Sequence, residues 1–372
     1  MTDRPSVGLL SEQLLRPVPG GIGTYVRALL RTLPMEGIKV VPYVAWHRGS
    51  ALRSAGLEQA RRLPLPRRPL HESWSRVGAP RPGTSVDLVH APSLAFPSRG
   101  RRPLVVTVHD VLFLEFPEAY TERGLAFHRR ALRRLSQADL VICPSRAAAD
   151  ALRSLPQELP DRIRVVPLGT DMARPAHPDG VLRELGIDGR YVVWMGTIEP
   201  RKNLQRAVAG FLRATNDDRS PDRPKLLLVG PAGWLDRPIL QYLEEPAVRA
   251  RVRRLGQLAP ARQAAVYAGA EALLLPSLGE GFGLPVLEAM ACGTPVVTSD
   301  RSSLPEVAGD AALLCDPLDE ESIAAALSSV LNDPELADRL RQRGLARASG
   351  FTWERTARET AACYREVLGG GT

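Results

Sequence analysis

The chain has 372 residues, of which 44% are hydrophobic and 24% are charged, which is ordinary usage for a globular protein of about two domains. No apolar run reaches the roughly 18 residues of a membrane span. The N-terminal sequence MTDRPSVGLL also lacks the basic patch and apolar stretch of a secretory signal. We therefore expect a cytoplasmic protein rather than a secreted or membrane-spanning one.

The net charge of +8 is concentrated in the N-terminal half. Residues 1–168 contain 25 Lys and Arg against 14 Asp and Glu, a balance of +11, whereas the rest contains 24 against 27, a balance of −3. A basic half indicates an anionic partner, which is nucleic acid, a phosphate group or an acidic membrane face.

Short apolar runs alternate with segments of helical spacing along the whole chain. In the first half, strands are predicted at residues 7–10, 38–46, 87–91, 104–110, 139–145 and 163–169. In the second half, they are predicted at residues 191–197, 225–233, 252–258, 271–277, 294–300 and 311–317. These runs are rich in Val and Leu without alternation, which is typical of parallel strands that are covered on both faces. Strands separated by helices predict an α/β fold with two Rossmann-like, doubly wound parallel sheets.

The same pattern predicts the domain boundaries. We expect a first domain at residues 1–170, a Pro-rich linker region at 171–190 and a second domain at 191–350, with helical residues after 317. Residues 48–84 interrupt the alternation, because their prolines and arginines argue against a long helix or a central strand. We expect a surface loop there, either a mobile one or one that covers an acceptor entrance.

The stretch GEGFGLPVLEAMACGTP, at residues 279–295, concentrates unusual features. Two carboxylates, Glu280 and Glu288, flank a glycine-rich loop and a proline suited to the first turn of a helix. The N-terminus of a helix after a parallel strand is a favourable place for a phosphate. Carboxylates accept hydrogen bonds from vicinal hydroxyls, so a ligand with a diphosphate between two sugars fits this combination. A nucleotide-diphosphate sugar is such a ligand.

The segment PSLGEGFGLPVLEAMACGTPVV resembles the E-x7-E region of retaining glycosyltransferases of family 4. The similarity extends to GTIEPRKNL (196–204), LLLVGPAG (226–233), LPEVAGDAALLCDP (304–317) and, less specifically, GGIGTYVRAL (20–29), and so covers most of the chain. The resemblance implies a GT-B fold, in which an N-terminal acceptor-binding domain and a C-terminal nucleotide-sugar-binding domain face a central cleft. It also implies that the last helix, within 351–372, returns to the N-terminal domain.

The resemblance assigns roles to the residues of this motif. It implies that Glu280 contacts the donor sugar and that Glu288 binds the ribose hydroxyls. The backbone amides around four residues would face the sugar and the β-phosphate: Gly281, Phe282, Gly283 and Leu284.

A second set of donor residues is expected after the strand at 191–197. Arg201 and Lys202 follow that strand, where they can neutralise a diphosphate leaving group. Gly196 and Thr197 are expected to bind the donor, although many family members have an Arg where this chain has Thr197. GT-B enzymes generally need no DxD metal site and the sequence has none, so we expect neither a metal nor a cofactor.

In the basic half, the resemblance implies a histidine near the donor sugar and the acceptor. His109 is the better candidate and His90 the second, and Asp110 is positioned to orient His109 or to hold the acceptor hydroxyl. Gly21 and Gly23, in the loop that opens the first helix, would allow a phosphate or an acceptor to approach closely.

The substrates follow from resemblance alone. GTIEPRKN resembles bacterial polysaccharide mannosyltransferases, so we expect GDP-mannose as donor, retention of configuration, and a glycan or a lipid-linked acceptor. UDP- and dTDP-sugars stay open. The alternatives are other sugar-nucleotide chemistry on the same fold, such as an epimerase, or a non-enzymatic nucleic-acid-binding protein. Nucleic acid is disfavoured by the 5% aromatic content and the absence of aromatic–basic interleaving.

The segment 123–138 predicts an amphipathic helix with an apolar arc around Phe127 and a cationic arc on the other side. We expect the cationic arc to dock reversibly on an anionic membrane on the cytoplasmic side, through Arg129, Arg130, Arg133 and Arg134. A merely solvated face, or one covered by the Arg-rich loop, is the alternative.

Overall fold

The computed structural model describes residues 4–83, 85–156, 159, 162–216, 222–233 and 237–369. The chain divides into two compact units. Unit 1 comprises Met1–Glu115, Thr121–Gly169 and Trp353–Thr372, and unit 2 comprises Phe116–Tyr120 and Thr170–Thr352.

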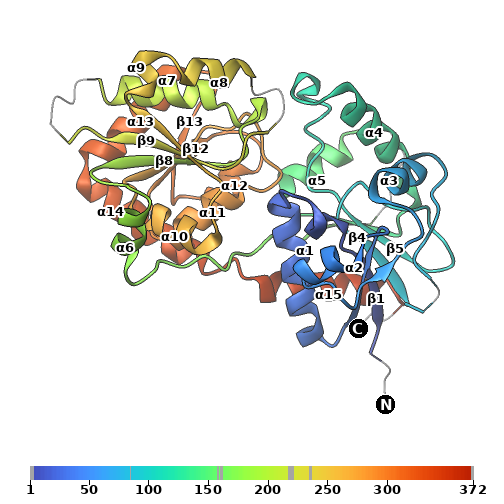
Figure 1. The fold of residues 1–372 in the computed structure, drawn as a ribbon. Coiled ribbons are helices and arrows are strands. Elements are labelled where there is room, and N and C mark those ends of the chain that lie inside the picture. The colour runs from blue at the N-terminus through green and yellow to red at the C-terminus, as the bar shows by residue number, and fades with distance from the viewer. Residues whose placement is uncertain are drawn as a thin grey trace. The chain divides into compact units, whose positions relative to one another are not determined.

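Unit 1 is built on a seven-stranded parallel sheet with the order β3-β2-β1-β4-β5-β6-β7. Its strands are β1 (Ser6–Leu10), β2 (Lys39–Val44), β3 (Arg61–Arg62), β4 (Leu88–Ala91), β5 (Leu104–Thr107), β6 (Leu140–Cys143) and β7 (Ile163–Val165). Its helices are η1 (Glu12–Leu15), α1 (Gly20–Thr32), η2 (Leu33–Glu36), α2 (Gly49–Ser54), α3 (Arg67–Arg76), α4 (Glu122–Arg133), η4 (Leu135–Gln137), α5 (Arg146–Arg153) and α15 (Trp353–Val367). The last of these, α15, packs against α1 and η2 and is red in Figure 1.

Unit 2 is built on a six-stranded parallel sheet with the order β10-β9-β8-β11-β12-β13. Its strands are β8 (Tyr191–Met195), β9 (Lys225–Val229), β10 (Val252–Gly256), β11 (Ala272–Leu275), β12 (Val296–Ser299) and β13 (Leu313–Cys315). Its helices are η3 (Pro117–Ala119), α6 (Pro178–Glu184), η5 (Pro200–Lys202), α7 (Leu204–Ala214), α8 (Arg237–Leu243), α9 (Pro246–Arg249), α10 (Pro260–Gly269), α11 (Leu284–Ala291), α12 (Leu304–Ala308), α13 (Glu320–Asn332) and α14 (Pro334–Ala348). Helices cover both faces of this sheet, with α7 packed on α13 and α11 packed on α14 (Figure 1).

The strand orders fix where a ligand can bind. In each sheet the order reverses once along the chain, between β1 and β4 in unit 1 and between β8 and β11 in unit 2. Ligands of doubly wound sheets bind beyond the carboxyl ends of the strands at such a reversal. A ligand of unit 2 is therefore expected at the loops after β8 and β11.

All twelve predicted strands are present, and the predicted fold of two doubly wound parallel sheets is confirmed. In the part of the chain that the structure describes, no helix combines the length and apolar composition needed to cross a membrane.

The surface-loop prediction for residues 48–84 was wrong. This segment contains α2, the edge strand β3 and α3. Pro69 is tolerated because it lies in the first turn of α3, where a backbone N–H has no partner within the helix. Leu70 and Trp74 lie one turn apart and are buried, and the Trp74 indole N–H donates to the Pro80 carbonyl at 2.7 Å. Burial of these two side chains packs α3 into unit 1, and the Trp74 hydrogen bond joins α3 to the residues that follow it in the same segment.

Candidate active site

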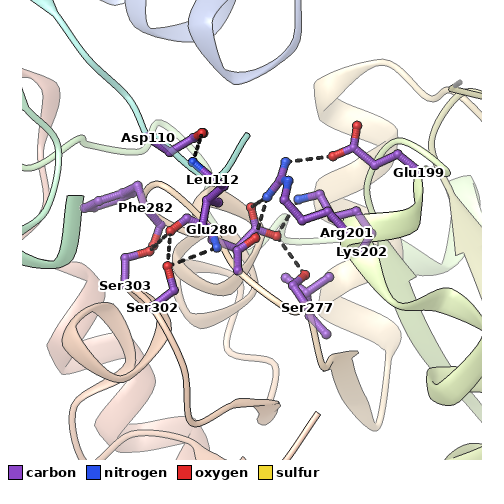
Figure 2. A network of polar contacts seen from close by, with 12 residues as sticks. Asp110, Leu112, Glu199, Arg201, Lys202, Ser277, Glu280, Phe282, Ser302 and Ser303 are labelled. Carbon is purple, nitrogen blue, oxygen red and sulfur yellow. Dashed lines mark hydrogen bonds and ion pairs between the residues drawn. The ribbon is translucent and has the colours of Figure 1, made fainter. Parts of the chain in front are cut away.

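The loops that follow β8 and β11 meet through a cluster of charged side chains (Figure 2). The Lys202 Nζ lies 2.6 Å from Glu280 Oε1, and an Arg201 guanidinium nitrogen lies 3.0 Å from Glu280 Oε2. The other terminal nitrogen of Arg201 donates to Glu199 at 2.7 Å. Two cations and two carboxylates therefore form one neutral network in unit 2.

Backbone geometry places the two cations. Asn203 adopts a left-handed conformation, with φ of 54°, which ends η5 and begins α7. Its side-chain amide donates to the carbonyls of Pro276 and Pro317 at 2.9 Å and 2.6 Å, and the Leu278 N–H donates to the Arg201 carbonyl at 2.9 Å. The loop that carries Arg201 and Lys202 is thus tied directly to the loop that carries Glu280.

Glu280 is held as a carboxylate. The residue is only 7% exposed, and the Ser277 hydroxyl donates to its Oε1 at 2.7 Å. Burial by itself would raise its pKa, but the charges of Lys202 and Arg201 outweigh burial and lower the pKa to about 2. Glu280 is therefore ionised throughout the physiological pH range.

The glycine loop between Glu280 and α11 has a defined shape. Gly283, the residue before α11, has a φ of 105°, and a Cβ there would lie 2.8 Å from a Leu304 methyl group. The Ser303 hydroxyl bonds to the carbonyls of Glu280 and Phe282 at 2.8 Å and 2.9 Å, and the Ser302 hydroxyl bonds to the Glu280 carbonyl at 2.6 Å. Because the carbonyls are satisfied from one side, the loop is preorganised ahead of the N-terminus of α11, which begins at Leu284.

Glu288 lies on α11 in a different environment. The Tyr267 hydroxyl donates to its Oε2 at 3.3 Å. Burial raises its pKa to about 7, although the Tyr267 hydrogen bond and the Lys202 charge act in the opposite direction. The two carboxylates of the motif thus differ in charge state near neutral pH, a difference that their spacing in sequence did not reveal.

Gly196 and Thr197 follow β8 and contact the loop after β9. A Cβ on Gly230 would overlap the Gly196 carbonyl, and Ile198 forms a backbone bridge with Ala232. Close packing of two backbones therefore explains Gly230, whereas a φ of 156° explains the glycine at position 196. Gly281, which lies in the loop of the charged network, is only partly buried.

In unit 1, His109 follows β5, and one of its ring nitrogens forms a hydrogen bond with the backbone. Its Nε2 lies 3.0 Å from the Pro92 carbonyl, which can only accept, so Nε2 carries the proton. Burial lowers the pKa of His109, while Pro92 and Asp110 oppose this effect. Tyr25 contacts the ring edge-on at 5.4 Å, and Asp110 accepts the Leu112 N–H at 3.1 Å. The neutral ring therefore carries its lone pair on Nδ1.

His90 belongs to the core of unit 1 rather than to an acceptor site. It is fully buried, and its two ring nitrogens lie 2.7 Å from the hydroxyls of Thr107 and Tyr364. Burial lowers its pKa to about 3. His90 links β4 to α15, so the expected contact with an acceptor is corrected to a structural role.

The glycines that open α1 have different surroundings. Gly21 is exposed in the first turn of the helix. Gly23 is buried, and a Cβ there would overlap the Pro19 side chain. Tight packing on Pro19 therefore accounts for Gly23 without a ligand, whereas Gly21 leaves the helix N-terminus open.

Only part of the predicted cationic arc of α4 is exposed to solvent. Arg129 and Arg133 are exposed. Arg130 lies within 4.0 Å of Glu72, and Arg134 donates to the Ser98 hydroxyl at 2.7 Å with its guanidinium over the Phe96 ring. The expectation of four outward-facing arginines is therefore corrected to two, because Arg130 and Arg134 are engaged in unit 1.

Comparison with known proteins decides what this arrangement is. Residues 183–347 match the model of "Glycosyl transferases group 1", and residues 19–174 match that of "Glycosyltransferase Family 4". The O-antigen chain mannosyltransferase B of Escherichia coli is 33% identical over 284 residues, which cover 75% of this chain and 74% of that protein. The chain belongs to glycosyltransferase family 4. This membership sets aside the epimerase and nucleic-acid-binding alternatives.

Other relatives agree with the family. A D-inositol 3-phosphate glycosyltransferase of Acidothermus cellulolyticus is 29% identical over 396 residues, covering 94% of this chain and 86% of the relative. Among solved structures, the sucrose-phosphate synthase of Thermosynechococcus elongatus superposes with a TM-score of 0.76 at 22% identity, covering 99% of this chain and all of that one. The Anabaena protein HepE in complex with UDP-glucose gives a TM-score of 0.73 at 19% identity, covering 97% of this chain and 99% of that one. These structures confirm the GT-B fold.

The structure adds site residues that sequence reasoning missed. Ser277, Ser302 and Ser303 fix the Glu280 loop, and Glu199 binds Arg201. Ser277 and Glu199 lie inside the matching motifs, as part of PSLGEGFG and GTIEPRKNL, so position in a motif was the available signal. Ser302 and Ser303 lie outside these two motifs. They reach the Glu280 loop because β11 and β12 are neighbours in the sheet, which the sequence alone does not show.

Proposed function

We propose that this enzyme transfers a hexose from a nucleotide-diphosphate sugar to a glycan or a lipid-linked acceptor, with retention of configuration. One observation carries the proposal: Glu280, Arg201 and Lys202 converge where β8 and β11 end, at the reversal of the unit 2 sheet. A carboxylate held between two cations can supply both an acceptor for sugar hydroxyls and positive charge for a leaving diphosphate.

Each residue has a distinct task in this proposal. Arg201 and Lys202 stabilise the negative charge that develops on the β-phosphate as the bond to the sugar breaks. Glu280 accepts hydrogen bonds from the donor sugar and holds both cations in position. Glu288 binds the ribose hydroxyls, and the amides of Gly281–Leu284 face the sugar and the β-phosphate together with Gly196 and Thr197.

Unit 1 supplies the acceptor side. With its proton on Nε2, His109 offers Nδ1 as an acceptor for a sugar or acceptor hydroxyl. Asp110 holds the Leu112 N–H and contributes a second acceptor beside His109. Gly21, at the open N-terminus of α1, is proposed to approach a donor phosphate.

GDP-mannose is the proposed donor. The 33% identity with an O-antigen chain mannosyltransferase supports mannose, and the UDP-glucose bound by HepE supports a nucleotide-sugar donor in general. We further propose a cytoplasmic enzyme that docks reversibly on the inner membrane face, where a lipid-linked acceptor is accessible.

A donor screen tests this function. Thermal midpoints with GDP, UDP and dTDP identify the nucleotide, because a tight ligand stabilises the fold by mass action. Release of the nucleotide from GDP-mannose, UDP-glucose and dTDP-glucose then identifies the sugar. The proposal predicts that GDP-mannose is turned over fastest and that Lys202→Ala abolishes turnover. If no nucleotide sugar is consumed, the proposed function is wrong; if UDP-glucose is preferred, only the mannose assignment fails.

A further inference from the structure

A second group of side chains gathers in unit 1, away from His109 on the chain. Arg16 ends η1, which follows β1; Trp46 follows β2; and Arg67 begins α3, which follows β3. Because β3, β2 and β1 are neighbouring parallel strands, their carboxyl ends share one edge of the sheet. Arg16, Trp46 and Arg67, together with His71 on α3, are called the edge cluster.

Hydrogen bonds hold the three loops of the edge cluster together. The backbone N–H of Trp46 donates to the carbonyl of Leu65, which lies two residues before Arg67, at 2.8 Å. Glu12 is buried at the start of η1, accepts the Ala45 N–H at 2.8 Å and lies 2.9 Å from His47 Nε2. The loop after β2 is therefore fixed on one side to the loop before α3 and on the other side to η1, which carries Arg16.

The cations of the edge cluster are not neutralised. Among the described residues, neither Arg16 nor Arg67 makes an ion pair, and the first turn of α3 has no acidic residue and no side-chain cap. Burial lowers the pKa of Arg16 and the nearby Arg67 charge lowers it further, although Glu12 acts in the opposite direction. Burial and the charges of Arg67 and Arg16 lower the pKa of His71 to about 4. Repulsion between the two guanidinium groups is relieved when an anion binds between them.

The helix beside these cations strengthens the same preference. The ten-residue helix α3 begins at Arg67, so its partial positive charge adds to that of the two guanidinium groups. His71 is neutral at pH 7 and stacks on Trp74 at a centroid distance of 5.7 Å, which leaves it able to donate a hydrogen bond. Two planar forks and an imidazole beside a helix N-terminus suit a phosphate group better than a single carboxylate.

Trp46 indicates what carries the phosphate. It is 52% exposed although Trp is a residue that proteins usually bury, and it stands between the two arginine-bearing loops. An exposed indole offers an apolar face and a polar edge, a combination that suits the face of a sugar ring. We propose that the edge cluster binds the phosphate of a phosphorylated saccharide acceptor, with Arg16 and Arg67 on the phosphate and Trp46 against a sugar ring.

This inference rests on the proposed function, since it names the acceptor class of the same enzyme. It predicts tighter binding of a sugar phosphate than of the uncharged sugar, by at least about tenfold for each charged contact that the sugar lacks. It also predicts that this binding does not require Arg201 or Lys202, both of which belong to unit 2.

Calorimetry with mannose 1-phosphate tests the edge cluster, with mannose as the uncharged control and with the donor site saturated by the nucleoside diphosphate that binds. Arg16→Gln and Arg67→Gln should each weaken mannose 1-phosphate at least about tenfold. Arg68→Gln, which removes an exposed neighbouring charge from the same helix turn, should have no effect. Trp46→Ala should weaken binding and Trp46→Phe should restore most of it. If mannose 1-phosphate binds, equal affinities in all five variants, or equal affinity for mannose, would overturn the inference.

Two sources of the phosphate are separated by a second arm. Neutral vesicles with and without a polyprenyl phosphate sugar are sedimented with wild-type protein, Arg67→Gln and Arg68→Gln. Binding to free mannose 1-phosphate indicates a soluble sugar phosphate, and Arg67-dependent binding only to the polyprenyl phosphate vesicles indicates a lipid-linked one. Absence of Arg67-dependent binding in both arms overturns the proposal. Nucleoside diphosphate affinity and thermal midpoint, measured for each variant, distinguish this failure from a failure of the proposed function or of folding.

Discussion

Lys202 and Glu280, 78 positions apart in sequence, meet with the ammonium nitrogen 2.6 Å from a carboxylate oxygen. The pair joins the loop after β8 to the loop after β11, and both residues are buried. A buried ion pair is expensive to break from one side only, because the remaining charge loses its partner in a poorly hydrated place. In the proposed function, a donor diphosphate therefore shares Lys202 and Arg201 with Glu280.

Glu280→Gln should separate turnover from nucleotide binding. We expect kcat to fall roughly 100-fold, because the cations lose the carboxylate that positions them on the transition state. Affinity for the free nucleoside diphosphate should be unchanged or higher, since the competing anion is gone. The free energy of unfolding should fall by about 3 kcal/mol, which denaturant titration measures.

Ser277→Ala is the matched control for that change. It removes one hydrogen bond from an uncharged donor to the same carboxylate oxygen and leaves the ion pair, so about 1.5–3 kcal/mol of stability should be lost and most of the turnover kept. A large drop in nucleoside diphosphate affinity in Glu280→Gln, measured by calorimetry, would contradict the assigned role.

Glu288 should make donor binding depend on pH near neutrality. Its pKa of about 7 means that the carboxylate form, which accepts from ribose hydroxyls, becomes dominant as the pH rises. Affinity for the nucleotide sugar should therefore increase between about pH 6 and pH 8 and then level off. Because the diphosphate of a nucleotide sugar is a diester, its own ionisation does not change in this range.

The control for this dependence is Glu288→Gln. The variant should bind the donor more weakly at pH 8, by roughly 1–3 kcal/mol, and the pH dependence should disappear. A slope of equal size in the variant would assign the titration to another group, such as His109.

Much of the fold could be predicted because buried parallel strands have a strong signature. The Val- and Leu-rich runs at β5, β8 and β11 are continuous and short, and they leave no amphipathic helix as an alternative. The helix α3 was missed because a proline inside a helix argues against it, whereas Pro69 lies in the first turn, which tolerates a proline.

The residues of the charged network were predicted one by one, but the contacts among them were not. The motif pointed to Glu280, and the loop after β8 pointed to Arg201 and Lys202, yet their pairing depends on β8 and β11 being neighbours in the sheet. His90 shows the same limit, because its partner Tyr364 comes from α15, 274 positions away. Local patterns carry no information on such long-range contacts.

Chelation should leave transfer intact. In the proposed function, Lys202 and Arg201 supply the positive charge that a divalent cation would otherwise bring to the leaving diphosphate. We expect the rate of nucleotide release from the preferred donor to be unchanged after dialysis against EDTA. A loss of activity that Mg²⁺ or Mn²⁺ restores would show that the two side chains do not suffice.

The exposed arginines of α4 should determine whether the enzyme docks on a membrane. Arg129 and Arg133 are exposed, whereas Arg134 is held by Ser98 and lies over Phe96. Each free Arg near an acidic lipid surface adds about 1 kcal/mol of attraction, and salt screens it. Sedimentation with anionic vesicles should therefore weaken roughly tenfold or more in the double variant Arg129→Gln and Arg133→Gln, and more strongly at low salt. Arg213→Gln with Arg339→Gln, which removes two exposed charges from unit 2, is the matched control and should bind like the wild type. If wild-type protein does not prefer anionic over neutral vesicles at low salt, the docking proposal is wrong.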